Sequence, residues 1–245
     1  MAKTNSGGTA PAFNQKGENM NCEIKYAPKC LNDIIYPSIG VERRIKAYAA
    51  KEVQGHIILH GPNGTGKTTL ANLLVKQIGN QKPFIELKDI DELLLKPNFK
   101  QYLQQSATFA TMTESEKYFL VLNEFDYSKK NLNKFWTSLD SCGDRVMAVI
   151  TTNQPMDIHP SIRSRCDLVE MPGIFANEAL PRIQYCLNLE GVNLPDKQIL
   201  HYLKLQEQFR DLRKYFRVAD QIIYLSRNNM TMPSWNNTPT SIRVV

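Results

Sequence analysis

The segment from Gly61 to Thr68, GPNGTGKT, constrains the fold of this 245-residue chain more than any other feature. It fits the spacing G-x-x-x-x-G-K-[ST] at every fixed position. The backbone N–H groups of such a loop point at a phosphate, and its glycines allow the phosphate to approach closely. A short apolar run at 56–60 precedes the segment, and apolar residues recur at helical spacing from Leu70 to Ile78 after it. This context of strand, loop and helix favours a phosphate-binding loop over a chance glycine-rich turn.

We therefore predict that the loop binds the phosphates of a nucleotide together with Mg²⁺. Lys67 is expected to reach the β- and γ-phosphates, and the hydroxyl of Thr68 is expected to bind the metal ion. The N-terminus of the following helix adds a partial positive charge. The remaining contacts expected from this segment involve Pro62, Asn63, Gly64, Thr65, Gly66 and Thr69.

Apolar runs that are typical of strands alternate with helical patterns along the first two thirds of the chain. This alternation predicts an α/β fold with a mostly parallel sheet that is covered on both faces. Besides 56–60, the expected strands are 83–87, 118–122, 146–150 and 167–170. Beyond a boundary at Met171-Pro172-Gly173, helical patterns at about 177–190, 195–206 and 209–227 predict a small helical domain. We expect a disordered arm at 1–20, a nucleotide-binding core at 21–172, this helical domain at 173–228 and a tail at 229–245.

The overall charge and composition narrow the partners and the compartment. A net charge of +6 favours a polyanionic partner. No apolar stretch approaches about 18 residues, and the N-terminus lacks an apolar core, so neither a membrane span nor a secretory signal is expected. The five cysteines show no C-x-x-C spacing, which predicts reduced thiols, no zinc site and a cytoplasmic location. Trp235 in the tail either anchors a partner or folds back onto its own domain.

Polar residues follow two of the expected strands. Glu124 comes after the strand at 118–122 and could activate the water that attacks the γ-phosphate, although it could also be a solvated loop acid. Asn153 comes after the strand at 146–150 and could orient that water, although Thr-Asn is also ordinary turn chemistry. Arg165 could project onto the nucleotide of a neighbouring subunit, or could be a surface arginine.

These features together resemble the AAA+ ATPases of the clamp-loader branch, which include the small subunits of replication factor C and the ATPase subunit of T-even phage clamp loaders. The resemblance covers about 23–227. KYAPK at 25–29 and LNDII at 31–35 look like the family's opening motif, which implies that Tyr26, Pro28 and Ile35 pack on adenine. NEFD at 123–126 is similar to the Walker B motif and Thr152-Asn153 to sensor 1. SRC at 164–166 is similar to the arginine-finger signature, and FRDLRK at 209–214 to sensor 2, which places Arg213 at the γ-phosphate.

The resemblance implies a five-stranded AAA+ sheet, a three-helix lid, and ATP with Mg²⁺ bound between subunits. It also implies self-assembly, or assembly with sister AAA+ subunits, into a ring or spiral around DNA, with a sliding clamp or another recruited protein as a further partner. By analogy it favours the finger role for Arg165.

The chain departs from the family pattern in three ways. Asn123 replaces an Asp that holds Mg²⁺ through water; Asn can still accept a hydrogen bond from that water but lacks the charge. Hydrolysis is therefore expected to be slow unless Asp126 compensates. Ala27 replaces an Arg, and the collar domain of clamp loaders is expected to be absent.

Three lysines after the Walker B-like motif, Lys129, Lys130 and Lys134, are expected to contact DNA phosphates regardless of sequence, or else to form a solvated helix face. Two functions stay open: an ATP-driven, clamp-loader-type protein that acts on DNA, and an ATP-gated scaffold in which binding is the working step. The finger-like and sensor-like arginines argue against a third, a small-substrate kinase.

Overall fold

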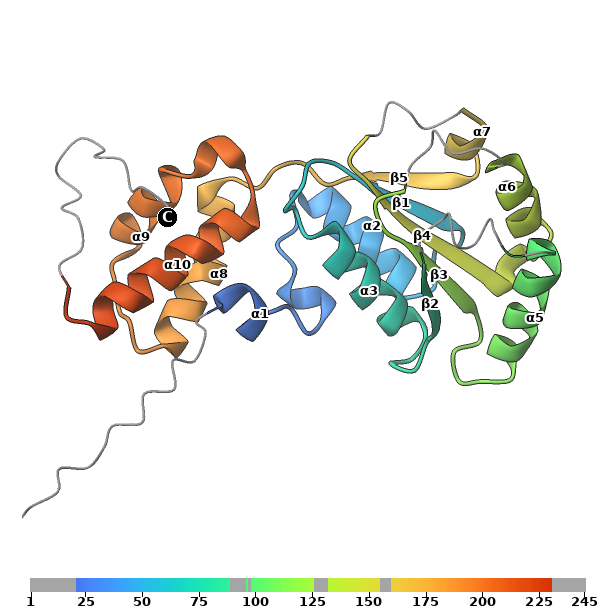
Figure 1. The fold of residues 1–245 in the computed structure, drawn as a ribbon, viewed down its shortest axis with the longest axis horizontal. Coiled ribbons are helices and arrows are strands. Elements are labelled where there is room, and N and C mark those ends of the chain that lie inside the picture. Colours follow the sequence, from blue (N-terminus) through green and yellow to red (C-terminus); the bar gives the residue numbers. More distant parts are fainter. Residues whose placement is uncertain (1–20, 89–95, 97, 126–131, 155–159, 231–245) are drawn as a thin grey trace, which may run out of the picture.

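The computed structural model describes residues 21–88, 96, 98–125, 132–154 and 160–230. Figure 1 shows two parts side by side: a sheet flanked by helices, and a separate group of helices from the C-terminal third of the chain. The strands are β1 (His56–His60), β2 (Phe84–Lys88), β3 (Tyr118–Leu122), β4 (Val146–Thr152) and β5 (Cys166–Glu170). Around the sheet lie α2 (Ile39–Ala49), α3 (Lys67–Ile78), α5 (Phe99–Thr111), α6 (Leu132–Asp140) and α7 (Pro160–Arg163).

The five strands form one parallel sheet in the order β2-β3-β4-β1-β5. Successive residues of a strand point to opposite faces, and β1 illustrates how both faces are covered. Ile57 and Leu59 join the core cluster that contains α2 and α3, whereas Ile58 joins the cluster that contains α5 and α6. A strand that is apolar on both sides, as β1 is, fits only a sheet with helices on both faces. The predicted α/β fold is confirmed.

Two strands are longer than the sequence pattern predicts: β5 begins one residue earlier, at Cys166, and β4 ends two residues later. β4 continues to Thr152 because Thr151 and Thr152 stay in register with Leu59 and His60 of β1. The ladder then continues into the glycine loop, where the N–H of Gly61 donates to the carbonyl of Thr152 at 3.2 Å. This extension ties the start of the loop to the carboxyl end of β4.

The C-terminal helices form a lid with its own apolar core. They are α8 (Ala176–Leu189), α9 (Asp196–Lys204) and α10 (Leu212–Arg227), and their core includes Ile183, Tyr215 and Ile223. None of the helices in the described ranges is long and apolar enough to cross a membrane.

The first described helix, α1 (Cys22–Lys25), packs on this lid rather than on the sheet (Figure 1). Cys22 is buried in the lid core, and its N–H donates to Asp220 of α10 at 2.8 Å. The buried carboxylate of Glu190, just after α8, accepts from Lys25 and Tyr26 of this N-terminal segment and from Arg227 of α10. The N-terminal segment is thus fastened to the lid, although our division of the chain, which stays a prediction, groups it with the core.

Candidate nucleotide-binding site

Two glycines of the loop are favoured by their backbone conformation and by atoms that lie close to them. Gly61 and Gly64 have φ of 143° and 74°, a region that side chains other than glycine rarely adopt. A Cβ atom at Gly61 would lie 2.1 Å from the carbonyl oxygen of Met171, and one at Gly64 would lie 1.8 Å from a carboxylate oxygen of Asp211. The loop is therefore held between the segment that leaves the sheet and the start of α10, and the N–H of Leu212 donates to the carbonyl of Gly64 at 3.0 Å.

Lys67 begins α3 and points back over the loop. Its Nζ lies 2.8 Å from the carbonyl oxygen of Gly61 and 2.6 Å from that of Pro62, and its side chain is buried. Burial lowers the pKa of this ammonium, the positive charge of Arg213 lowers it further, and the carboxylate of Glu124 opposes the shift. The site therefore brings two cations and one acid into electrostatic range of each other across the loop, the strand ends and the lid.

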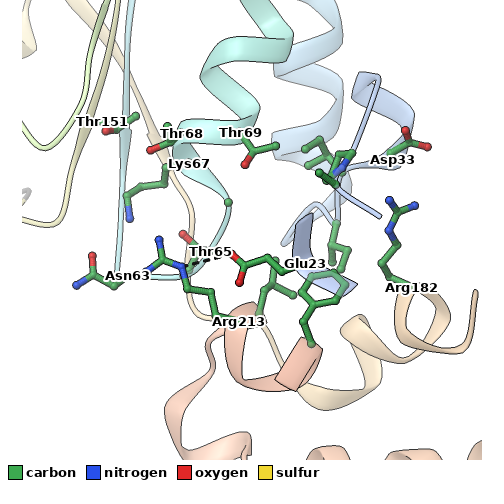
Figure 2. A pocket seen from close by; sticks show the side chains of 18 of the residues that line it. Glu23, Asp33, Asn63, Thr65, Lys67, Thr68, Thr69, Thr151, Arg182 and Arg213 are labelled. Atoms are coloured by element: carbon green, nitrogen blue, oxygen red, sulfur yellow. Dashed lines mark ion pairs between the residues drawn. The ribbon is translucent and has the colours of Figure 1, made fainter. Parts of the chain in front are cut away.

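The loop forms one end of a cavity of about 380 Å³ between the sheet and the lid, a size typical of small-molecule sites. Figure 2 shows Asn63, Thr65, Lys67 and Arg213 on one side of it, and Asp33 and Arg182 on the other. The lining also includes a set of apolar residues, Ile24, Ala27, Pro28, Ile34, Ile35, Leu212 and Phe216. The cavity therefore has a charged end at the loop and an end that is mostly apolar apart from Asp33 and Arg182.

The carboxyl ends of β3 and β4 present Glu124, Thr151 and Asn153 to the cavity. Glu124 has φ of 51°, a left-handed conformation that costs a non-glycine residue roughly 1–2 kcal/mol. Hydrogen bonds hold it there: the N–H of Glu124 donates to the hydroxyl of Thr151 at 3.1 Å, and the N–H of Phe125 donates to the carbonyl of Thr151 at 2.9 Å. Strain of this kind clusters at functional sites.

The structure brings most of the expected site residues to this cavity. Its lining includes Pro28, Ile35, Asn63, Gly64, Thr65, Gly66, Lys67, Thr68, Thr69, Glu124, Asn153 and Arg213. Arg213 also pairs loosely with Glu23, its Nε lying 3.7 Å from a carboxylate oxygen (Figure 2).

Four expected residues lie outside the lining. Tyr26 turns its hydroxyl to Glu190 at 2.5 Å and packs against the lid core. Pro62 contributes the carbonyl that Lys67 binds. Asn123 is exposed just before Glu124. Their roles stay predictions, as does that of Arg165.

Arg165 lies at the opposite edge of the sheet. Its Nε is 2.9 Å from a carboxylate oxygen of Asp140, at the end of α6, and it shares a surface hollow with His56 and Val146, the first residues of β1 and β4. Because the glycine loop follows the carboxyl end of β1, the structure does not bring Arg165 to the loop of its own chain.

The expected DNA-contacting lysines cannot be placed. Lys129, Lys130 and the acid Asp126 lie outside the described residues. Lys134 falls within α6, but its side chain also lies outside the described part.

Sequence reasoning missed four polar residues that line the cavity: Glu23, Asp33, Thr151 and Arg182. Thr151 could have been found, since it stands in the strand end that contains Asn153. Arg182 carries no such signal, because it is one polar residue on an amphipathic helix more than a hundred residues from the loop.

This fold is that of a P-loop NTPase, and the cavity lies at its glycine loop. The family model described as "ATPase family associated with various cellular activities (AAA)" matches residues 57–172. The chain is 25% identical over 207 residues to a replication factor C small subunit of Aeropyrum pernix, which covers 83% of this chain and 62% of the relative. It is 26% identical over 210 residues to the sliding-clamp-loader large subunit of Escherichia phage RB69, which covers 81% of this chain and 63% of the relative.

Among solved structures, a point variant of RuvB from Thermotoga maritima superimposes with a TM-score of 0.61 at 19% identity, covering 83% of this chain and 67% of that one. This likeness concerns the fold alone. The matches confirm the resemblance to AAA+ ATPases of the clamp-loader branch, and the chain has the fold of an AAA P-loop NTPase. It spans about three fifths of the length of these curated relatives.

Proposed function

We propose that the protein binds and hydrolyses ATP as a subunit of an oligomeric, clamp-loader-like assembly that acts on DNA, in replication or in mobile-element or phage DNA metabolism. One observation carries the proposal: the glycine loop, Lys67, Glu124 and Arg213 meet at one cavity although they come from distant parts of the chain. The similarity to clamp-loader subunits supports the same function.

The charged end of the cavity suits a triphosphate. Backbone N–H groups of the loop and the N-terminus of α3 favour anions, and Lys67 and Arg213 add two positive charges. Mg²⁺, when bound, neutralises phosphate charge; Thr68 and, through water, Asn123 would hold it. Glu124 lines the cavity at the end of β3, beside the loop, where it would accept a proton from the attacking water.

The apolar end suits the base. Pro28 and Ile35 line it from the N-terminal segment and Leu212 and Phe216 from the lid. A purine in this slot would therefore contact both parts of the protein, so that nucleotide occupancy would affect the orientation of the lid.

The remote position of Arg165 supports a role in trans. Since this arginine lies at the sheet edge away from its own loop, it is available to the loop of a neighbouring copy or of a sister AAA+ subunit. Its partner Asp140 would then hold the guanidinium in position.

Replacing Arg165 with Ala tests this arrangement. We expect ATP affinity to stay unchanged and turnover of the assembled protein to fall by about 10³-fold or more, because an arginine finger stabilises the transition state rather than the bound substrate. Turnover is measured over a range of protein concentrations. Arg43→Ala, on the exposed side of α2, is the matched control. Equal turnover in both variants would contradict the finger role.

The proposed DNA contact is tested by replacing Lys129, Lys130 and Lys134 together with Ala. If the three lysines each neutralise a phosphate, the slope of log affinity against log salt should become shallower by about 2–3. The control removes three exposed lysines elsewhere, Lys76, Lys197 and Lys204. An unchanged slope in the first variant would show that the lysines form only a solvated face.

A second function, an ATP-gated scaffold or recruiter in transposition, helicase loading or defence, is favoured by Asn123. This residue lacks the charge of the usual Asp and does not line the cavity. The steady-state ATPase rate, measured alone and with primer–template DNA, separates the two functions. ATP turnover that is stimulated by DNA supports the clamp-loader-like function. Tight ATP binding with almost no turnover in either condition supports the scaffold function.

A further inference from the structure

Arg182, on the lid helix α8, reaches the apolar end of the cavity, and no motif accounts for it. Its Nη2 donates to the carbonyl oxygen of Tyr26 at 2.6 Å, and its guanidinium carbon lies 5.4 Å from the ring centre of Tyr185. Its Nε is buried and has no hydrogen-bond partner among the described residues. Figure 2 shows the side chain rising from the lid toward Asp33.

The opposite side of this end is a strap, which we define as residues 26–35. The carboxylate of Asp33 closes the strap on itself by accepting from the N–H groups of Lys29 at 2.8 Å and Cys30 at 3.2 Å. These hydrogen bonds hold the pKa of Asp33 below its usual value, and the charge of Arg182 lowers it further. Arg182 thus fixes the first residue of the strap by a hydrogen bond, and its positive charge stabilises the ionised carboxylate of Asp33.

Between the strap and the lid lies an apolar slot with a polar end. Ala27, Pro28 and Ile35 of the strap face the cavity that Leu212 and Phe216 of α10 also line. Arg182 lines the same cavity, and the Tyr26 carbonyl holds its guanidinium beside the slot. The guanidinium therefore borders the place where a flat heteroaromatic group would enter.

We propose that Arg182 is a binding residue for the nucleoside half of the nucleotide, and that its guanidinium donates to an acceptor on the base or the ribose. The proposal rests on the function proposed above. It gives the lid two separate contacts with one ligand: Arg213 at the phosphates and Arg182 at the nucleoside.

The test compares two probes that share the phosphate end of the cavity but not the nucleoside end. ATP and inorganic tripolyphosphate are titrated calorimetrically into the full chain and into the variant Arg182→Gln. Gln keeps an N–H group for the Tyr26 carbonyl but loses the charge and the other donors of the guanidinium. We expect ATP to bind about tenfold more weakly, because one charge-assisted hydrogen bond is lost, and tripolyphosphate to bind as in the wild type. Arg217→Gln, an exposed arginine on α10, should change neither.

Equal weakening of both probes would overturn the proposal, since it would mean that the variant loosens the lid as a whole; so would unchanged ATP affinity. Arg182→Lys, which keeps the charge but not the geometry, should show the same selective loss of ATP affinity. It replaces the Gln variant if that variant does not fold.

Titration with 2′,3′-dideoxy-ATP locates the acceptor. A selective loss that persists with this analogue places the acceptor on the base, and one that disappears places it on the ribose. A wild-type chain that binds ATP, with an Arg182→Gln variant that binds it equally well, overturns the inference alone, and a wild-type chain that does not bind ATP overturns the proposed function as well.

Discussion

Replacing Lys67 with Ala should weaken ATP binding by at least about 100-fold, equivalent to roughly 2.7 kcal/mol of binding free energy. Lys67 is the buried cation of the phosphate end, and its Nζ lies within 2.8 Å of two loop carbonyls. Charge-assisted hydrogen bonds to phosphate are among the strongest that a protein makes, and no other lysine lines the cavity formed by the described residues. The variant should therefore lose the nucleotide-dependent rise in melting temperature that a ligand at 100 times its Kd produces by mass action, about 2.7 kcal/mol of added stability.

The matched control is Lys76→Ala, which removes an exposed lysine from the same helix, α3, and should leave ATP binding unchanged. Without nucleotide, the melting temperatures of the two variants should also be compared, because the loop carbonyls of Gly61 and Pro62 lose a donor in the first of them. A Lys67→Ala variant that keeps its ATP-dependent melting shift would show that the cavity does not hold phosphates at the loop.

The sheet could be predicted from the sequence because its strands are buried on both faces and therefore appear as continuous apolar runs. The run at 56–60 coincides with β1 and that at 118–122 with β3, while β4 exceeds its run by two polar residues. Those two, Thr151 and Thr152, are strand residues only because β1 pairs with them. Local pattern therefore predicted the strands, and tertiary pairing decided where β4 ends.

Much of the phosphate end of the site could be predicted for a different reason: a single local motif supplies its loop and Lys67. The nucleoside end could be predicted only in part. The opening motif points to Pro28 and Ile35, whereas Leu212, Phe216 and Arg182 come from two lid helices that are distant in sequence.

Tyr26 has contacts that the motif does not predict. The motif assigns it to the base, which stays a prediction, and in the structure its hydroxyl binds Glu190 and its carbonyl binds Arg182. Only packing of α1 on the lid produces that arrangement.

The effect of replacing Glu124 with Gln should be opposite in kind to that of Lys67→Ala: ATP should bind as tightly as before, and turnover should fall by about 10²–10⁴-fold, the usual contribution of a general base. Gln keeps the size of the side chain and can adopt the same backbone, so the hydrogen bonds of residues 124 and 125 to Thr151 should persist. Only the ability to accept a proton is lost. Single-turnover measurements with preassembled protein separate the chemical step from product release.

The control for this substitution is Glu170→Gln, at the carboxyl end of β5, where the acid lies at the same edge of the sheet but outside the cavity. It should leave turnover unchanged. If the two variants lose turnover equally, the effect is one of charge at the sheet edge and Glu124 is not the base. If Glu124→Gln turns over ATP at the wild-type rate and that rate is already very low, Asn123 limits the reaction instead. The cavity at Glu124 would then bind ATP without hydrolysing it at a useful rate, as the scaffold function requires.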